Sequence, residues 1–184
     1  MSPQRLAPPV SERDHTQGDP SAEVTLIEYG DFECPYCGAA YPVLKRVTAR
    51  MGSRLRFVYR SFPIGDVHPH AEHAAEAAEG AGAQGKFWEM HDLLFENQER
   101  LGGGLYLELA QELRLASEDL REALEKREFQ ARVRADFAGG VRSGVNGTPT
   151  FFINGQRHDA AFEYEDLVEA IDVATRALPK ARPA

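Results

Sequence analysis

Apolar residues follow two spacings along the chain, and the order of these spacings predicts an α/β fold. Residues 24–29 form a short, β-branched and apolar run that ends at Gly30, as in a buried strand. From Pro35 to Val47 apolar residues recur at helical spacing, and Pro35 suits the first turn because its missing N–H would be unpaired there. Bulky and charged residues then alternate over 55–60, which indicates a second strand. This β-α-β order predicts two parallel strands joined by a right-handed crossover.

The rest of the chain divides into a helical segment and a second segment that contains strands. Residues 66–140 are rich in alanine, contain no convincing strand and predict four or five helices. The strand pattern returns at 150–153, and Asn154-Gly155 is a strong two-residue hairpin turn into 156–158. A final amphipathic helix is expected after this hairpin. Residues 1–22 are polar and proline-rich without periodicity, so a flexible lead-in is expected there.

The composition fits a folded protein and disfavours two kinds of partner. The chain has 184 residues, 42% of them apolar and 27% charged, which suits one compact domain or a small domain with a large insertion. No run approaches the roughly 20 consecutive apolar residues of a membrane helix, so no membrane insertion is expected. The net charge of −8 predicts no nucleic-acid partner, because a polyanion would be repelled. Residues 66–140 hold 16 acidic and 8 basic residues, whereas the remainder holds 13 of each, so the acidic excess lies in the helical segment.

The two cysteines, Cys34 and Cys37, lie where the first strand gives way to its helix. A bridge between them closes too small a loop to stabilise the fold much, so a reactive role is the better interpretation. A thiolate at the helix start would face unpaired N–H groups and the positive end of the helix dipole, which predicts Cys34 as the nucleophile. Cys37 lies one turn further on, where it can attack a mixed disulfide and resolve it.

Metal binding is disfavoured by the number of available ligands. Tetrahedral zinc needs about four ligands, and the chain has no second cysteine pair. His68, His70 and His73 form an H-x-H-x-x-H pattern, but no carboxylate or cysteine completes an obvious set. We therefore predict no metal site, and we interpret the aromatic stripe of residues 87–95 as core.

Together, these motifs resemble the DsbA-like thiol-disulfide oxidoreductases of the thioredoxin superfamily. The resemblance covers residues 23–178: Cys-Pro-Tyr-Cys follows the first strand, a helical segment follows the second, and Val-Asn-Gly-Thr-Pro-Thr-Phe at 145–151 leads into the third. It implies an α/β thioredoxin fold with an inserted all-helical domain. The expected parts are a flexible N-terminal segment at 1–22, a thioredoxin-fold domain at 23–65 and 141–178, and a helical insertion at 66–140.

The resemblance also implies roles for individual residues. In the family, the proline that matches Pro149 is cis and lies against the active-site disulfide, and the residue before it, here Thr148, offers backbone groups to the substrate. Pro35 and Tyr36, between the cysteines, are expected to contact the substrate as well. Glu28 matches a partly buried acid that assists proton transfer at the second cysteine. Burial would raise the pKa of this carboxyl and let it accept the thiol proton.

The other acids near the cysteines are interpreted differently. Asp31 and Glu33 are closer to them in sequence, but both are expected on a solvated turn, where they tune the local field. For Glu28, the alternative is a carboxylate at the sheet margin without a catalytic role.

The sequence departs from the secreted family members in three respects. It shows no signal segment, it has Tyr36 where the strongly oxidising enzymes have histidine, and it has Thr148 before the proline. If Met1 is the native start, the cytoplasm is the expected location. Pro-Tyr between the cysteines is also similar to glutaredoxins, whose potentials lie near −200 to −230 mV, against about −120 mV for the strongest periplasmic oxidant.

The sequence therefore predicts a thiol-disulfide oxidoreductase that exchanges disulfides with protein or peptide substrates and needs no bound cofactor. An unidentified redox partner would reset the cysteine pair. Two alternatives stay open: a reductase of small or glutathione mixed disulfides, and a non-catalytic redox-sensing binding module.

Overall fold

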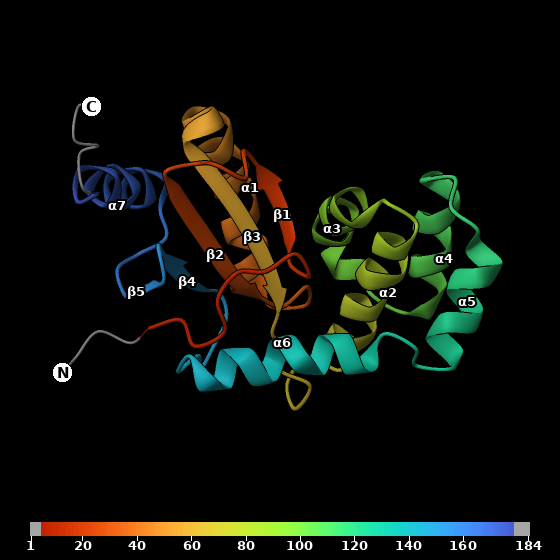
Figure 1. The fold of residues 1–184 in the computed structure, drawn as a ribbon. Helices are drawn as coiled ribbons and strands as arrows, with labels where there is room; N and C mark the ends of the chain where they lie inside the picture. The colour runs from red at the N-terminus through yellow and green to blue at the C-terminus, as the bar shows by residue number, and fades with distance from the viewer. Residues whose placement is uncertain (1–4, 179–184) are drawn as a thin grey trace.

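The computed structural model describes residues 5–178 and contains one five-stranded sheet with helices on both faces (Figure 1). The strand order is β1-β3-β2-β4-β5. The strands are β1 His15–Gly18, β2 Val24–Gly30, β3 Leu55–Ser61, β4 Thr150–Ile153 and β5 Gln156–His158. This sheet confirms the predicted α/β class.

The predicted β-α-β unit is present, and it forms the centre of the sheet. Strands β2 and β3 are parallel, and helix α1 (Pro35–Met51) connects them through a short 3₁₀ turn. Strand β4 then pairs antiparallel with β2 and forms a hairpin with β5. The turn between β4 and β5 has φ of 48° at Asn154 and 79° at Gly155, the positive values that a tight hairpin turn needs.

Alternate residues of the central strands enter two separate cores. Leu26 and Phe57 belong to the larger core, which also includes residues of α1 and of the last helix, α7 (Tyr164–Arg176). Ile27 and Val58 point to the opposite face and enter a smaller core. Glu28 has the same strand parity as Leu26, so its carboxyl points towards the α1 side of the sheet.

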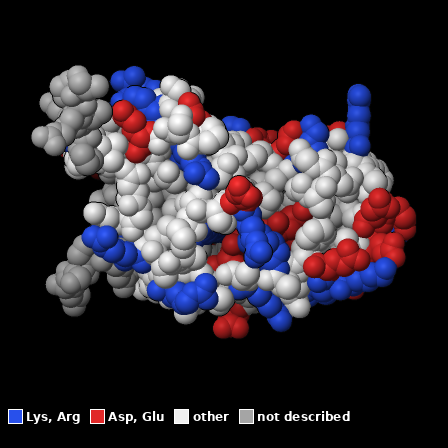
Figure 2. Space-filling view, in the orientation of Figure 1, with Lys and Arg blue, Asp and Glu red and all other residues white. Residues whose placement is uncertain are grey.

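Five helices follow β3 within the described residues and form the inserted unit. They are α2 Ala71–Ala83, α3 Phe87–Glu96, α4 Gly103–Glu112, α5 Ser117–Glu125 and α6 Gln130–Arg142. Helices α2 to α5 pack beside the sheet, and α6 runs back along it (Figure 1). The aromatic stripe at 87–95 is core, as predicted, with Phe87, His91 and Phe95 buried. Acidic side chains gather at the outer end of this unit, near basic ones (Figure 2).

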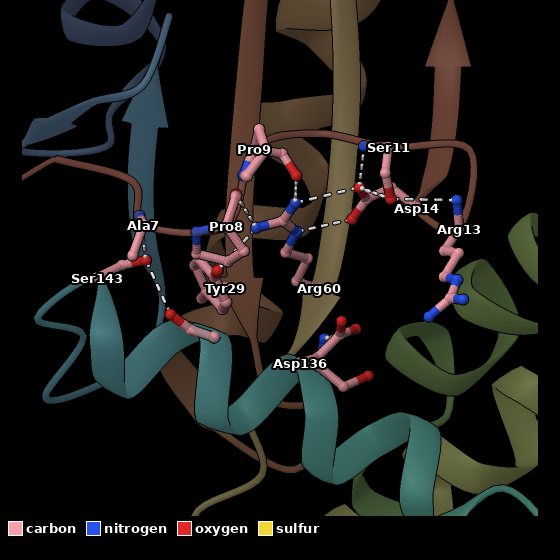
Figure 3. A network of polar contacts seen from close by, with 12 residues as sticks. Ala7, Pro8, Pro9, Ser11, Arg13, Asp14, Tyr29, Arg60, Asp136 and Ser143 are labelled. Atoms are coloured by element: carbon pink, nitrogen blue, oxygen red, sulfur yellow. Dashed lines mark hydrogen bonds and ion pairs between the residues drawn. The ribbon is translucent and has the colours of Figure 1, made fainter.

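The N-terminal segment is packed rather than flexible over residues 5–22, which corrects the prediction for that part; residues 1–4 lie outside the described residues. Strand β1 pairs antiparallel with β3. Arg60 of β3, 4% exposed, donates to Asp14 at 2.7 and 3.1 Å and to the carbonyls of Pro8 and Pro9 at 3.0 Å (Figure 3). These contacts bind the segment to the sheet, because a buried guanidinium needs partners for its N–H groups.

Within residues 5–178, no helix combines the length and the apolar character that crossing a membrane requires.

Candidate active site

Cys34 is the N-cap residue of α1, and Pro35 occupies the first turn of that helix. No side chain caps this helix start, so its free N–H groups and the positive end of the dipole face the Cys34 sulfur. The Cys34 sulfur lies 3.3 Å from the Thr148 carbonyl oxygen and can donate to it when protonated. The segment before β4 therefore meets the nucleophile directly.

The two thiols of the pair have opposite properties. Hydrogen bonding with the Cys37 thiol, helped by Thr148 and by backbone N–H groups of α1, lowers the pKa of Cys34 to about 5. Burial raises the pKa of Cys37 well above its usual range, and the Cys37 side chain is fully enclosed. Cys34 is therefore a thiolate near neutral pH, whereas Cys37 is a thiol that needs a base.

The residues predicted to meet the substrate surround Cys34. Tyr36 is 68% exposed and Pro35 is also exposed, so both can contact a bound chain. The Thr148–Pro149 peptide bond is cis. The buried Thr148 hydroxyl also lies near the Cys34 sulfur, where it helps to lower the pKa of that thiol.

Glu28 lies beneath the cysteine pair and is almost completely buried, with 1% exposed. Burial, together with the nearby charge of Cys34, raises the pKa of the Glu28 carboxyl to about 8. Its Oε1 atom has no hydrogen-bond partner among the described residues, and its charge raises the pKa of Cys37. The structure thus places Glu28 inside the fold, next to the thiol that needs a base, and not at an exposed sheet margin.

Asp31 is buried and structural, so the expectation of a solvated turn is wrong for this residue. Its Oδ1 accepts from the Glu33 N–H at 2.8 Å, and its Oδ2 accepts from the Ile64 N–H and contacts His68 Nδ1, both at 2.8 Å. The Asp31 N–H also donates to Cys37 Sγ at 3.4 Å. The Asp-x-Glu spacing is a sequence signal for the first contact, whereas the contacts to residues 64 and 68 depend on the tertiary fold.

Gln98, which follows α3, is a second residue that sequence reasoning missed. Its amide donates to the carbonyls of Phe32 at 2.8 Å and Cys34 at 3.0 Å, and this holds the cysteine loop. Gly38 permits this approach, because a Cβ there would lie 2.3 Å from the Gln98 amide oxygen. No local signal marks Gln98, since its partners lie more than 60 residues away.

A cavity of about 670 Å³ lies between α2, α4 and α5, and sequence reasoning did not foresee it. Its lining includes His70, His73, Tyr106, Leu107 and Arg121. It is connected to the cysteine loop through His70, whose N–H donates to Glu33 at 2.6 Å and whose carbonyl accepts from the Tyr106 hydroxyl at 3.3 Å. Within the part of the chain that the structure describes, no cluster of three or more His, Cys, Asp or Glu side chains could hold a metal ion.

The chain combines a thioredoxin fold, a helical insertion after β3 and a cysteine pair at the start of α1. Residues 10–173 match a family described as Thioredoxin, and the chain belongs to this family. BdbD from Bacillus subtilis in its oxidised form has a similar fold, with a TM-score of 0.83 and 23% identity over 96% of this chain and 100% of that one. A thioredoxin-like oxidoreductase from Silicibacter pomeroyi is 29% identical, with a TM-score of 0.77 over 91% of this chain and 95% of that one.

Curated relatives are much longer than this chain. A protein of Salinispora arenicola named Na(+)/H(+) antiporter NhaA 1 is 45% identical over 178 residues, which are 95% of this chain and 27% of the relative. The chain therefore spans about a quarter of that relative's length, and the antiporter name describes the relative as a whole.

Proposed function

We propose that this protein exchanges disulfides with protein or peptide substrates, with Cys34 as the attacking thiolate and Cys37 as the resolving thiol. The observation that carries this proposal is the geometry of the pair: Cys34 is at the uncapped start of α1 and contacts Thr148, whereas Cys37 is fully enclosed, and the pKa values of the two thiols shift in opposite directions accordingly. A thiolate at neutral pH attacks a disulfide readily, whereas a buried thiol reacts only when a base removes its proton.

The exchange proceeds in two displacements. The Cys34 thiolate attacks one sulfur of the substrate disulfide, so a mixed disulfide forms and the first substrate thiol leaves. Glu28 then takes the proton of Cys37, and the Cys37 sulfur attacks Cys34 as the second substrate thiol leaves. The substrate gains two electrons and the enzyme pair loses them. The reverse sequence oxidises a substrate dithiol.

The groups around Cys34 bind and orient the substrate. The Thr148 carbonyl already contacts its sulfur, and a substrate chain would replace that contact while packing beside Pro149 and the exposed Tyr36. The electrons reside in the sulfur pair itself, so the exchange needs no bound cofactor. A thiol or disulfide partner of unidentified nature resets the pair.

One observation favours the small-disulfide alternative. The cavity between α2, α4 and α5 has the volume of a small-molecule site, and its lining includes the Arg121 guanidinium, the imidazoles of His70 and His73 and the Glu125 carboxylate. A compound that carries both carboxylates and an amino group, such as glutathione, would suit these groups. A reductase of glutathione mixed disulfides is therefore the second candidate, and a redox sensor without turnover is the third.

The experiment combines trapping with turnover. A Cys37→Ser variant should accumulate a mixed disulfide with a peptide disulfide, and a Cys34→Ser variant should not; mass spectrometry locates the adduct. With excess dithiothreitol present to reduce the cysteine pair after each exchange, the wild type should then turn over many equivalents of peptide disulfide, and faster than glutathione disulfide at equal concentration. An adduct mainly on Cys37 contradicts the assignment. A single turnover supports the sensor, and faster reaction with glutathione disulfide supports the small-disulfide reductase.

A further inference from the structure

Beside Glu28 lies a cavity of about 10 Å³ lined by side chains of β1, β2, β3, α1 and α3. This volume is close to that of one water molecule. Glu28, His91, Asp92 and Lys45 are among its lining residues. Two atoms of these residues, Glu28 Oε1 and His91 Nε2, are buried and have no hydrogen-bond partner among the described residues. Since buried polar atoms nearly always have a partner, each of these atoms needs one, and the cavity that both residues line is where a shared partner would lie.

The two ring nitrogens of His91 have different surroundings and therefore different protonation. Its Nδ1 lies 3.0 Å from Asp92 Oδ1, so Nδ1 carries the proton and donates it to the carboxylate. The other nitrogen, Nε2, is then an unprotonated base. The ring is 4% exposed and is held by aromatic neighbours, among them Tyr59 at 4.7 Å and Phe95 at 5.0 Å between ring centroids. Burial lowers the pKa of His91, which keeps the resting imidazole neutral.

From His91 a series of polar groups continues to the surface. The Asp92 side chain is 24% exposed and forms an ion pair with Lys45, whose side chain is 55% exposed. The other titratable groups near the imidazole are Tyr41 from α1, Tyr59 from β3 and His15 from β1. Asp92 is the carboxylate that contacts His91 directly, and it reaches solvent.

We propose that His91 and Asp92 carry the proton of Glu28 to solvent through one water molecule in this cavity. The inference rests on the proposed role of Glu28 and extends it. Glu28 receives the proton of Cys37 during resolution and passes it to the water, and the water gives a proton to His91 Nε2. The Nδ1 proton then passes to Asp92 and on to bulk water, so the imidazole becomes neutral again. No electrons move in these steps, and the opposite reaction uses the same route inwards.

The first test is a His91→Gln variant, which keeps a polar side chain of moderate size but cannot carry a proton. We expect the resolving step to slow roughly tenfold at pH 7, below the ~10²–10⁴-fold of complete proton-transfer catalysis because the relay acts through Glu28. The initial attack by Cys34 should be unchanged. The solvent deuterium isotope effect on resolution should increase, which loss of packing alone would not cause. His15→Gln is the matched control, since that ring stacks on Phe87 but does not line the cavity.

A double-variant cycle separates this relay from the role of Glu28. In a Glu28→Gln background, His91→Gln should slow resolution no further, because no proton enters the route. If Glu28→Gln alone leaves resolution unchanged, the role of Glu28 fails and the relay fails with it. If Glu28→Gln slows resolution but folded His91→Gln stays within twofold of the wild type, the relay alone is overturned. Should His91→Gln not fold, Asp92→Asn tests the same route, and an unchanged resolving rate and isotope effect there overturns the relay.

Discussion

Single residues at this site differ in role because their surroundings differ. Cys34 and Cys37 carry the same thiol, yet hydrogen bonding with Cys37 lowers the pKa of Cys34 and burial raises the pKa of Cys37. The roles of both cysteines and of Glu28 are predicted from the strand-to-helix junction and from a family resemblance, and the structure has Cys34 at the start of α1 and Glu28 buried in β2. Asp31 was misjudged because its partners come from a later loop, and Gln98 was missed because its partners lie in the cysteine loop. Contacts of this kind leave no periodic pattern in the sequence.

Replacing Glu28 by Gln tests whether this carboxyl assists the resolving step of Cys37 and not the initial attack by Cys34. The carboxyl pKa of about 8 means that the base is mostly protonated at pH 7 and becomes ionised as the pH rises. In the wild type the resolving rate should therefore rise between pH 7 and 9, and Glu28→Gln should lose this rise and be about 10-fold slower or more at pH 8. Rapid mixing with a peptide disulfide measures both steps. Equal resolving rates across this range would leave Glu28 without a catalytic role.

Glu28→Gln should also change the stability of the fold, and the pKa shift of Glu28 gives the direction of that change. A carboxyl whose pKa is raised on folding contributes stability below its unfolded pKa and loses it as the pH rises through the folded value. For Glu28 this loss extends from about pH 4.5 to about pH 8. Glu28→Gln should therefore unfold at a higher temperature than the reduced wild type at pH 9, and gain less at pH 5. Calorimetry at pH 9 and at pH 5 measures the unfolding temperatures of Glu28→Gln and the wild type, and it serves as the stability control for the kinetic experiment.

Elements that bury an apolar face were predicted, and β5 was predicted from its turn, whereas strand β1, which has neither signal, was missed. Strands β2, β3 and β4 and the helices of the insertion have clear periodicity. Strand β1, with the sequence His-Thr-Gln-Gly, has none, because it lies at the sheet edge and is held by polar contacts. Its order derives from its pairing with β3, from Arg60 and Asp14, and from Trp88, whose indole N–H donates to the Thr16 carbonyl at 3.1 Å.

Breaking the Arg60–Asp14 pair should therefore release the N-terminal segment. Both side chains are about 5% exposed or less, and Asp14→Ala leaves a buried guanidinium without its carboxylate. We expect a loss of about 3 kcal/mol in the free energy of unfolding, together with faster amide exchange in β1. The matched control is Asp172→Ala, which breaks the exposed Arg54 pair and should cost less than ~1 kcal/mol. Equal losses in the two variants would contradict a structural role for the buried pair.

The loss of stability in Asp14→Ala should depend on pH, and the pKa shift of Asp14 gives the direction of that dependence. Burial opposes ionisation of Asp14, but the hydrogen bonds and charge of Arg60 prevail and lower its pKa. A lowered carboxyl pKa contributes stability above the unfolded value, and this contribution is lost as the pH falls through the folded value. The difference between the wild type and Asp14→Ala should therefore be complete at pH 7 and shrink below about pH 4. Urea unfolding at pH 7 and at pH 3 measures it.

Across the whole molecule, charge is separated from the reactive sulfur. The net charge is −8, and the acidic excess belongs to residues 66–140. In the view of Figure 2 the acidic side chains are gathered over the outer helices, with basic ones among them. Apart from Glu33, which precedes it, the nucleophile is flanked by Pro35, Tyr36, Thr148 and Pro149, which carry no charge. Long-range attraction and close contact with the substrate therefore come from different parts of the molecule.

The net negative charge of the protein should therefore affect how fast a charged substrate meets it, more than how the residues around Cys34 contact that substrate. Peptide disulfides of equal length with three added lysines or three added glutamates should differ a fewfold in the rate of attack by Cys34 at low salt, with the cationic peptide faster. The difference should fall towards one at high salt, since the Debye length shrinks from roughly 30 Å at 0.01 M to about 3 Å at 1 M. Stopped-flow mixing over this salt range measures the ratio, with a neutral peptide as control. A large preference for the cationic peptide that persists at 1 M salt would instead place an acidic side chain, such as Glu33 beside the nucleophile, in direct contact with the substrate.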